Sequence, residues 1–321
     1  MRVALLVNKD NYERYAPNTP PEWEMIHIGN GEPDVTEIIA TRADVLVVDA
    51  VMKIGPDIIA AMPDLKLIHS QGVAYNAIDL KEANRRGIYV CNNAGVNAQA
   101  VAEQVVLLTL SLLRNYRVNE DMVYAGRQME AKTACFINGM RELGECSVGI
   151  VGLGAIGKAL AERLAAFGCR LCYYDMYKPV TSVEYLPLTE LYAASDIVSL
   201  HVPVTEETEG MINEESLRHF KKGAILINTA RGELIDNAAV AQALVSGQLG
   251  GFGADTLSPE PVTADNPFLR ALPDEARGRV ALSPHIGGVT TGCFIRGYGN
   301  IMKNIAAISR GERPVFVVNG L

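Results

Sequence analysis

The stretch Ser147-Val148-Gly149-Ile150-Val151-Gly152-Leu153-Gly154-Ala155-Ile156-Gly157 decides the fold class of this chain. Its apolar residues 148–151 predict a buried strand. Three glycines follow in G-x-G-x-x-G spacing, and residues 155–167 repeat apolar side chains with a helical period. In such a turn the first glycine permits the bend, the second admits a pyrophosphate, and the third lets the helix pack on the strand. We therefore expect a dinucleotide to bind at the start of this helix, at Gly152, Gly154, Ala155, Ile156 and Gly157.

A second strand with an acidic end strengthens this interpretation. Residues 170–174 read as a strand, and Asp175 closes it. Asp175 lies 175 − 157 = 18 residues after the last glycine, near the spacing of about 20 typical of the acid that binds the adenosine ribose. A carboxylate there would repel a 2′-phosphate, so the sequence favours NAD over NADP.

Composition excludes several classes of protein. The chain has 321 residues, 49% of them hydrophobic, which is enough for a sizeable core and about two domains. Its net charge is −8 and it has no long basic run, so we expect no nucleic-acid partner. No apolar stretch reaches membrane-spanning length, and residues 3–7 are too short for a signal peptide core, so we expect no membrane partner and a cytoplasmic location. The six cysteines are scattered and predict free thiols rather than a metal site.

Strands and helices alternate along the chain in two series. The first has strands at 3–7, 44–48, 66–69 and 87–90, and the second continues after 147 with strands at 194–200, 223–228, 251–255 and 280–283. This alternation predicts an α/β protein with two Rossmann-like or flavodoxin-like domains, each built on a parallel sheet, and a cleft between them. An apolar helix over 99–113 and an irregular arm over 117–147 separate the two series. An amphipathic stretch over 293–308 returns the chain to the first domain. We expect a substrate domain of residues 1–98 and 290–321, and an NAD-binding domain of residues 99–289.

Polar residues with catalytic chemistry follow three strands of the second series. Arg231, Glu260 and His285 all lie just beyond predicted strand ends. The carboxyl ends of parallel strands share one edge of a sheet, the edge that binds ligands in open α/β folds, so these side chains should lie beside the glycine turn.

The order and spacing of these segments resemble the D-isomer-specific 2-hydroxyacid dehydrogenases over nearly the whole chain. The resemblance rests on the glycine turn with Asp175 and on four further segments: His201-Val202-Pro203, Asn228-Thr229-Ala230-Arg231-Gly232, Asp255 to Pro261, and Ser283-Pro284-His285. It implies a two-domain enzyme, a homodimer built on the nucleotide domain, and a catalytic set of Arg231, Glu260 and His285.

The chemistry of these residue types agrees with that implication. Arg231 offers a planar fork of donors to the substrate carboxylate. His285 can exchange a proton with the substrate oxygen as hydride is transferred, and Glu260 would hold the imidazole. The loop after the third strand should bind substrate through Val73, Ala74 and Tyr75. By resemblance, the remaining cofactor contacts are His201, Pro203, Thr229, Ala230, Asp255, Gly287 and Val101, the last of which could equally be ordinary helix core.

Two departures bear on the substrate. Phosphoglycerate-type members place arginines where this chain has Asp49 and Ser70, although Lys53 remains nearby in the sequence. We therefore expect a small unphosphorylated 2-oxo acid such as glyoxylate, hydroxypyruvate or pyruvate. The alternative is a dinucleotide-sensing binding protein, like the co-repressors that share this fold, because fold alone does not separate the two.

Overall fold

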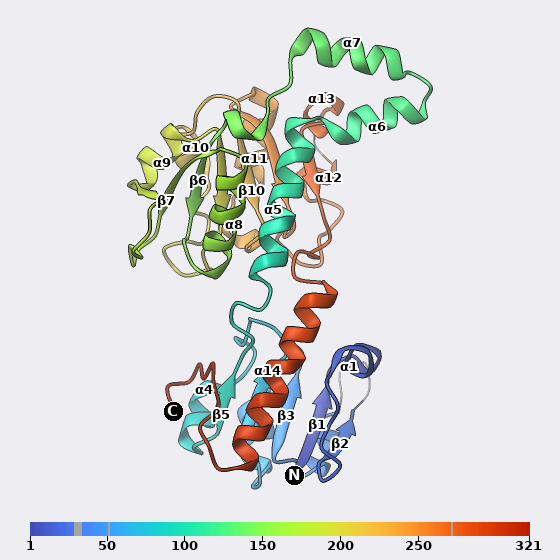
Figure 1. Ribbon diagram of the computed structural model, residues 1–321, viewed down its shortest axis with the longest axis vertical. Helices are drawn as coiled ribbons and strands as arrows, with labels where there is room; N and C mark the ends of the chain where they lie inside the picture. The colour runs from blue at the N-terminus through green and yellow to red at the C-terminus, as the bar shows by residue number, and fades with distance from the viewer. Residues whose placement is uncertain (29–33, 51, 271) are drawn as a thin grey trace. The chain divides into compact units, whose positions relative to one another are not determined.

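The chain folds into two α/β units, each built on one parallel sheet (Figure 1). The computed structural model describes residues 1–28, 34–50, 52–270 and 272–321. One unit comprises Met1–Asn97 and Val289–Leu321, and the other comprises Ala98–Gly288. The prediction of an α/β fold with two parallel-sheet domains is confirmed. Within the described residues, no helix is long and apolar enough to cross a membrane.

The first unit has a five-stranded sheet in the order β2-β1-β3-β4-β5. Alternate strand residues point to opposite faces. Ala4, Leu46 and Ile68 lie in one core cluster with residues of α2, α3 and α4, and the other face packs against α1 and α14. The elements are β1 (Arg2–Leu6), α1 (Lys9–Tyr15), β2 (Glu24–His27), α2 (Val35–Ala40), β3 (Val45–Val48), α3 (Pro56–Ala61), β4 (Leu67–Ser70), α4 (Leu80–Arg85), β5 (Tyr89–Cys91) and α14 (Thr291–Ser309).

A buried histidine links the first sheet to α14. His69 lies in β4, and burial lowers its pKa to about 4. Its ring is therefore neutral at physiological pH: Nδ1 donates to the Ser70 carbonyl at 2.8 Å, and Nε2 accepts from Asn304 at 3.0 Å. The residue thus has a structural role, with both ring nitrogens hydrogen-bonded inside the unit.

The second unit has a seven-stranded sheet in the order β12-β11-β10-β9-β6-β7-β8. Its elements are α5 (Ala98–Leu113), α6 (Tyr116–Tyr124), α7 (Gln128–Asn138), η1 (Leu143–Glu145), β6 (Ser147–Val151), α8 (Ala155–Ala166), β7 (Arg170–Tyr174), β8 (Glu184–Tyr185), α9 (Leu188–Ala194), β9 (Ile197–Leu200), α10 (Glu214–Leu217), β10 (Ala224–Asn228), η2 (Gly232–Leu234), α11 (Asn237–Ser246), β11 (Leu249–Ala254), α12 (Pro267–Arg270), α13 (Asp274–Arg277) and β12 (Val280–Leu282).

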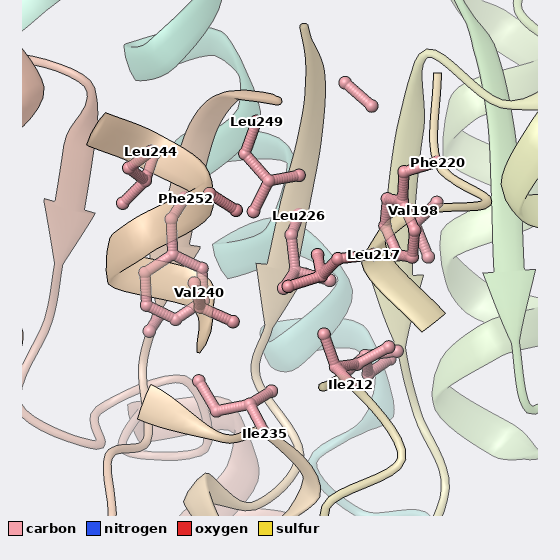
Figure 2. Packing of buried hydrophobic residues seen from close by; sticks show 14 of the residues in the cluster. Val198, Ile212, Leu217, Phe220, Leu226, Ile235, Val240, Leu244, Leu249 and Phe252 are labelled. Carbon is pink, nitrogen blue, oxygen red and sulfur yellow. The ribbon is translucent and has the colours of Figure 1, made fainter. Parts of the chain in front are cut away.

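Two apolar layers cover this sheet. One contains α5 and α8, and the other contains α9, α10, α11 and α12. Figure 2 shows the second layer, where Leu226 of β10 and Phe252 of β11 cluster with Val240 and Leu244 of α11. Each such side chain contributes roughly 1.5–3 kcal/mol on burial. The sheet that carries the strand ends is therefore packed on both faces.

The strand order reverses at β6. From this strand the chain continues to β7 on one side and later to β9 on the other. Such a reversal leaves a crevice at the carboxyl ends of the two strands, and ligands bind there in open parallel sheets. The glycine turn leaves the carboxyl end of β6, directly at this point.

Several expected elements differ from the structure. Residues 117–147 are not irregular, because most of this segment forms α6 and α7, which project as a helical hairpin from their unit (Figure 1). The strand expected from 194 begins at Ile197, because residues 188–194 form α9. The edge strands β2 and β8 were not predicted. The helices α6 and α7 bury at most one side chain each, and β2 and β8 bury none, so these elements lack the run of buried apolar residues from which the other elements were predicted.

Candidate active site

The glycine turn after β6 has the backbone geometry that its spacing predicts. Gly152 has φ +95°, and a Cβ there would lie 2.7 Å from the His201 carbonyl oxygen. A Cβ on Gly157 would collide with the Gly152 carbonyl, so only glycine lets α8 approach the strand this closely. A Cβ on Gly154 would meet no described atom within 4 Å. Ala155 and Ile156 begin the helix beside this open space, where first-turn N–H groups lack intrahelical acceptors.

Asp175 lies at the end of β7, next to the glycine turn. Its Oδ2 accepts the N–H of Leu153 at 2.7 Å, and its Oδ1 accepts the N–H of Tyr177 at 2.9 Å. Each carboxylate oxygen has a second lone pair. The residue therefore fixes the turn and retains acceptor capacity for hydroxyl groups of a ligand.

The loop that carries Arg231 is held by a buried asparagine. Asn228 ends β10; its Nδ2 donates to the Arg231 carbonyl at 2.7 Å, and its Oδ1 accepts from Ala230 N–H at 3.1 Å. A Cβ on Gly232 would collide with the backbone of Leu257 and Ser258, so this loop touches the loop that follows β11. The Arg231 side chain is exposed, and its Nη1 donates to the Ala230 carbonyl at 2.7 Å.

His285 and Glu260 form a hydrogen-bonded pair. His285 Nδ1 lies 2.6 Å from Glu260 Oε1, and the two side chains are 42% and 51% exposed. His285 has φ +56°, a left-handed conformation rare for a residue with a Cβ. The bond to Glu260 leaves the opposite nitrogen, Nε2, available to a ligand, the arrangement expected of an acid–base histidine. The structure thus brings together two of the predicted catalytic residues and places the Arg231 loop against the segment that leads to Glu260.

A buried carboxylate organises the His285 loop. Asp255 Oδ1 accepts from Ser283 Oγ at 2.5 Å and from Ile286 N–H at 3.0 Å, while Oδ2 accepts from Gly287 N–H at 2.7 Å. The His285 N–H also donates to the Asp255 carbonyl at 2.8 Å. Asp255 and Gly287 were both expected to contact the cofactor; in the structure they are hydrogen-bonded to each other. Sequence reasoning missed this loop-holding role because the partners lie about thirty residues apart.

Buried polar atoms without partners line the same sheet edge. His201 Nδ1 and Thr229 Oγ1 are buried and have no hydrogen-bond partner among the described residues. Burial lowers the pKa of His201 to about 4, so its ring is neutral, and its Nε2 lies 2.8 Å from Ser199 Oγ. Such atoms are rare unless a ligand or water satisfies them. The edge therefore fits a polar ligand such as a dinucleotide.

The other predicted cofactor residues differ in exposure. Pro203 is exposed and Ala230 is half-buried at the same edge, whereas Val101 is buried in α5. Among the described residues, no group of three His, Cys, Asp or Glu side chains is arranged to hold a metal ion. Cys169 and Cys172 are free thiols, and burial raises the pKa of Cys169 to about 11, which makes it unreactive at neutral pH.

The predicted substrate loop follows β4 in the first unit. Val73 is 37% exposed, and Ala74 and Tyr75 are half-buried. No acceptor in the described part of the chain takes the N–H of Val73 or Ala74. These two groups are available to an anionic ligand.

The sequence profile of the D-isomer specific 2-hydroxyacid dehydrogenase NAD binding domain matches residues 106–287. A glyoxylate reductase of Korarchaeum cryptofilum is 34% identical over 327 residues, covering 99% of this chain and 96% of the relative. The chain belongs to the D-isomer specific 2-hydroxyacid dehydrogenase family. Another member, a hydroxypyruvate reductase of Thermotoga maritima, is 38% identical over 261 residues, covering 81% of this chain and 82% of the relative.

A solved structure extends the likeness to the fold. D-2-hydroxyisocaproate dehydrogenase superposes with a TM-score of 0.87 at 26% identity, covering 100% of both chains. As a member of this family, the protein described by the present chain is an oxidoreductase that uses NAD. The predicted family, enzyme class and cofactor are therefore confirmed. The glycine turn, the helix that follows it and the unpartnered polar atoms give its second unit the features such a cofactor needs.

Proposed function

We propose that the chain uses NADH to reduce a small unphosphorylated 2-oxo acid to the D-2-hydroxy acid, with Arg231, Glu260 and His285 as the catalytic set. The observation that carries the proposal is the His285–Glu260 pair, 2.6 Å apart, on the strand-end edge that also carries the glycine turn and Arg231. In this proposal the second unit binds NAD and the first binds substrate.

Each residue has one task in the reduction. Bound NADH supplies the hydride that reaches the carbonyl carbon. His285 delivers a proton from Nε2 to the carbonyl oxygen as the carbon–oxygen double bond becomes single. Glu260, bonded to Nδ1, fixes the ring orientation and stabilises the imidazolium before the transfer. Arg231 binds the carboxylate and the adjacent oxygen through its fork of donors. The N–H groups of Val73 and Ala74 also donate to the carboxylate, and Tyr75 is the third substrate-binding residue of the loop.

The cofactor contacts follow from the edge described above. The first turn of α8, with Gly154, Ala155 and Ile156, would hold the pyrophosphate on its N–H groups. Asp175 would accept the adenosine ribose hydroxyls. The remaining contacts in the proposal are His201, Pro203, Thr229, Ala230, Asp255, Gly287 and Val101.

The substrate class rests on two considerations. The similar proteins named above are a glyoxylate reductase and a hydroxypyruvate reductase, both named for small unphosphorylated acids. Position 49, directly after β3, is an aspartate, and position 70, the last residue of β4, is a serine, so neither is an arginine. The Ser70 hydroxyl donates to the Ala74 carbonyl at 2.6 Å. A phosphate with about two negative charges normally requires arginine forks or a helix N-terminus. We therefore favour glyoxylate, hydroxypyruvate or pyruvate.

The proposal includes a homodimer. The α6–α7 hairpin exposes large apolar side chains: Tyr124 is 85% exposed, Phe136 90% and Ile137 74%. Apolar patches of this kind on a helical projection usually mark an interface. Light scattering after gel filtration should give twice the chain mass, and Phe136→Glu should lower it. A monomeric wild-type chain would rule out the dimer.

The decisive experiment is steady-state NADH oxidation with a panel of 2-oxo acids. We expect turnover with glyoxylate, hydroxypyruvate or pyruvate, and a higher kcat/KM for hydroxypyruvate than for phosphohydroxypyruvate. A clear preference for the phosphorylated acid would overturn the substrate class. NADH binding without turnover of any 2-oxo acid would instead favour a dinucleotide sensor.

A further inference from the structure

Four consecutive carbonyl groups of the loop after β4 are hydrogen-bonded within the first unit. Asn93 Nδ2 donates to the Gln71 carbonyl at 2.7 Å, and the Asn93 N–H donates to the Gly72 carbonyl at 2.9 Å. Asn92 Nδ2 donates to the Val73 carbonyl at 2.7 Å. The Ser70 hydroxyl donates to the Ala74 carbonyl at 2.6 Å. Every carbonyl in this run, from Gln71 to Ala74, therefore has a hydrogen-bond donor.

The planarity of the peptide bond converts these carbonyl contacts into N–H directions. In a trans peptide the C=O of one residue and the N–H of the next point in opposite directions. The Gly72 carbonyl is held by Asn93, so the N–H of Val73 points away from it. The Val73 carbonyl is held by Asn92, so the N–H of Ala74 points away likewise. Both N–H groups lack an acceptor among the described residues.

The side chains of Asn92 and Asn93 supply donors to the loop, while their own amide oxygens stay unpaired within the described residues. Asn92 and Asn93 are 4% and 0% exposed, and they follow β5 directly. Each donates from its NH2 group to a loop carbonyl, and its Oδ1 is buried with no hydrogen-bond partner among the described residues. A buried unsatisfied acceptor is destabilising, so a pair of them is not explained by stability.

Helix α14 contacts both the loop and Asn93. Gln71 Nε2 donates to the Tyr298 hydroxyl at 2.7 Å, and Tyr298 is buried. A Cβ on the neighbouring Gly297 would lie 3.2 Å from Asn93 Nδ2, so the helix backbone lies against the asparagine. The loop is thereby held at both its side chains and its backbone.

We infer that Asn92 and Asn93 are positioning residues, which fix the loop 71–74 so that the N–H groups of Val73 and Ala74 bind the substrate carboxylate. The inference rests on the proposed function. The role of Asn92 is the more direct of the two, because its side chain donates to the carbonyl of the Val73–Ala74 peptide, which carries the Ala74 N–H. Neither asparagine needs to touch the substrate.

The test compares an acid with its ester. Pyruvate offers a carboxylate to the two N–H groups, whereas methyl pyruvate does not. Asn92→Leu should lower the ratio of kcat/KM for pyruvate to kcat/KM for methyl pyruvate by about tenfold, mainly through KM for pyruvate. The KM for NADH should stay within about twofold, because no cofactor group is altered. Asn93→Leu should act in the same direction but less strongly.

The matched control is Asn319→Leu. Asn319 is another buried asparagine of the first unit, but its amide holds Asn84, Ile88 and Val90 rather than the loop. The Asn319→Leu substitution should lower Tm but leave the ratio of kcat/KM for pyruvate to kcat/KM for methyl pyruvate unchanged. If Asn92→Leu does not fold, Asn92→Ala removes the same donor with less steric change and replaces it in the comparison. An active wild type whose ratio is unchanged in the Asn92 variant would overturn this inference alone. A wild type inactive on every 2-oxo acid would overturn the proposed function as well.

Discussion

Asp175 should set the choice between NADH and NADPH, and the size of the effect follows from its surroundings. The carboxylate lies beside the glycine turn, half-buried, and would face the adenosine ribose. Two unit charges 4 Å apart repel by about 1 kcal/mol even in water. A 2′-phosphate has about two charges, so the repulsion at that separation is about 2 kcal/mol, or roughly a thirtyfold preference for NADH.

Asp175→Ala should reverse part of this preference by two routes. It removes the repulsion, and it releases the N–H groups of Leu153 and Tyr177, which donate to the carboxylate at 2.7 and 2.9 Å. Released N–H groups are suitable donors for a phosphate. We expect the ratio of kcat/KM for NADH to kcat/KM for NADPH to fall by about thirtyfold or more, with a lower kcat/KM for NADH from the lost ribose contacts.

The assay measures both cofactors at one fixed concentration of the best 2-oxo acid. Asp175→Asn is the control, because the amide oxygen can still accept from Leu153 while the charge is lost. If charge dominates, the Asn variant should show most of the change in ratio. A wild type that prefers NADPH, or an unchanged ratio in Asp175→Ala, would refute the reasoning.

Three further variants test the site and the stability of its unit. His285→Gln should lower kcat by about two orders of magnitude or more, the usual contribution of general acid–base catalysis, while NADH binding followed by fluorescence persists; near-wild-type turnover would contradict its role. Arg231→Lys keeps the charge but loses the fork, so a strong fall in kcat/KM for the 2-oxo acid is expected, and an unchanged value would rule out carboxylate binding by Arg231. Burial alone would raise the pKa of Asp196, but hydrogen bonds from Ser147 and Arg141 outweigh it and hold that pKa below its ordinary value. A lowered carboxyl pKa stabilises the fold above the unfolded pKa of about 4 and loses that contribution as pH falls further. Thermal unfolding of Asp196→Asn should therefore show a Tm deficit at pH 7 that shrinks below about pH 4, and a deficit independent of pH would contradict this assignment.

The alternation of strands and helices was readable from the sequence because buried elements leave a hydrophobic period. Strand β7 has the predicted limits, residues 170–174. The helices α6 and α7 were missed because their many charged residues indicated an irregular arm. No residue of α6 is buried, so its apolar side chains, such as Val118 and Val123, are exposed rather than packed in the core of its unit.

Some features of the candidate site were likewise predictable from the sequence, and others were not. The glycine turn was predictable because its three glycines and two flanking elements lie within one short segment, where spacing alone restricts backbone conformation. The roles of Arg231, Glu260 and His285 stay predictions, although the structure places the last two in contact. The interaction of Asp255 with Gly287 was not predictable, because residues 32 apart are joined by a hydrogen bond that no periodicity encodes.

The sequence by itself therefore determined the fold class, the dinucleotide turn and the family, since each depends on local spacing or on ordered motifs. Only the tertiary structure decided which donors satisfy which acceptors. Asn92 lies 19 residues from the loop carbonyl it holds, and Asn93 lies 22 residues from its own. Side-chain hydrogen bonds act at about 3 Å and depend on packing rather than on distance along the chain. The direction of the N–H groups in the substrate loop is for that reason a property of the folded unit.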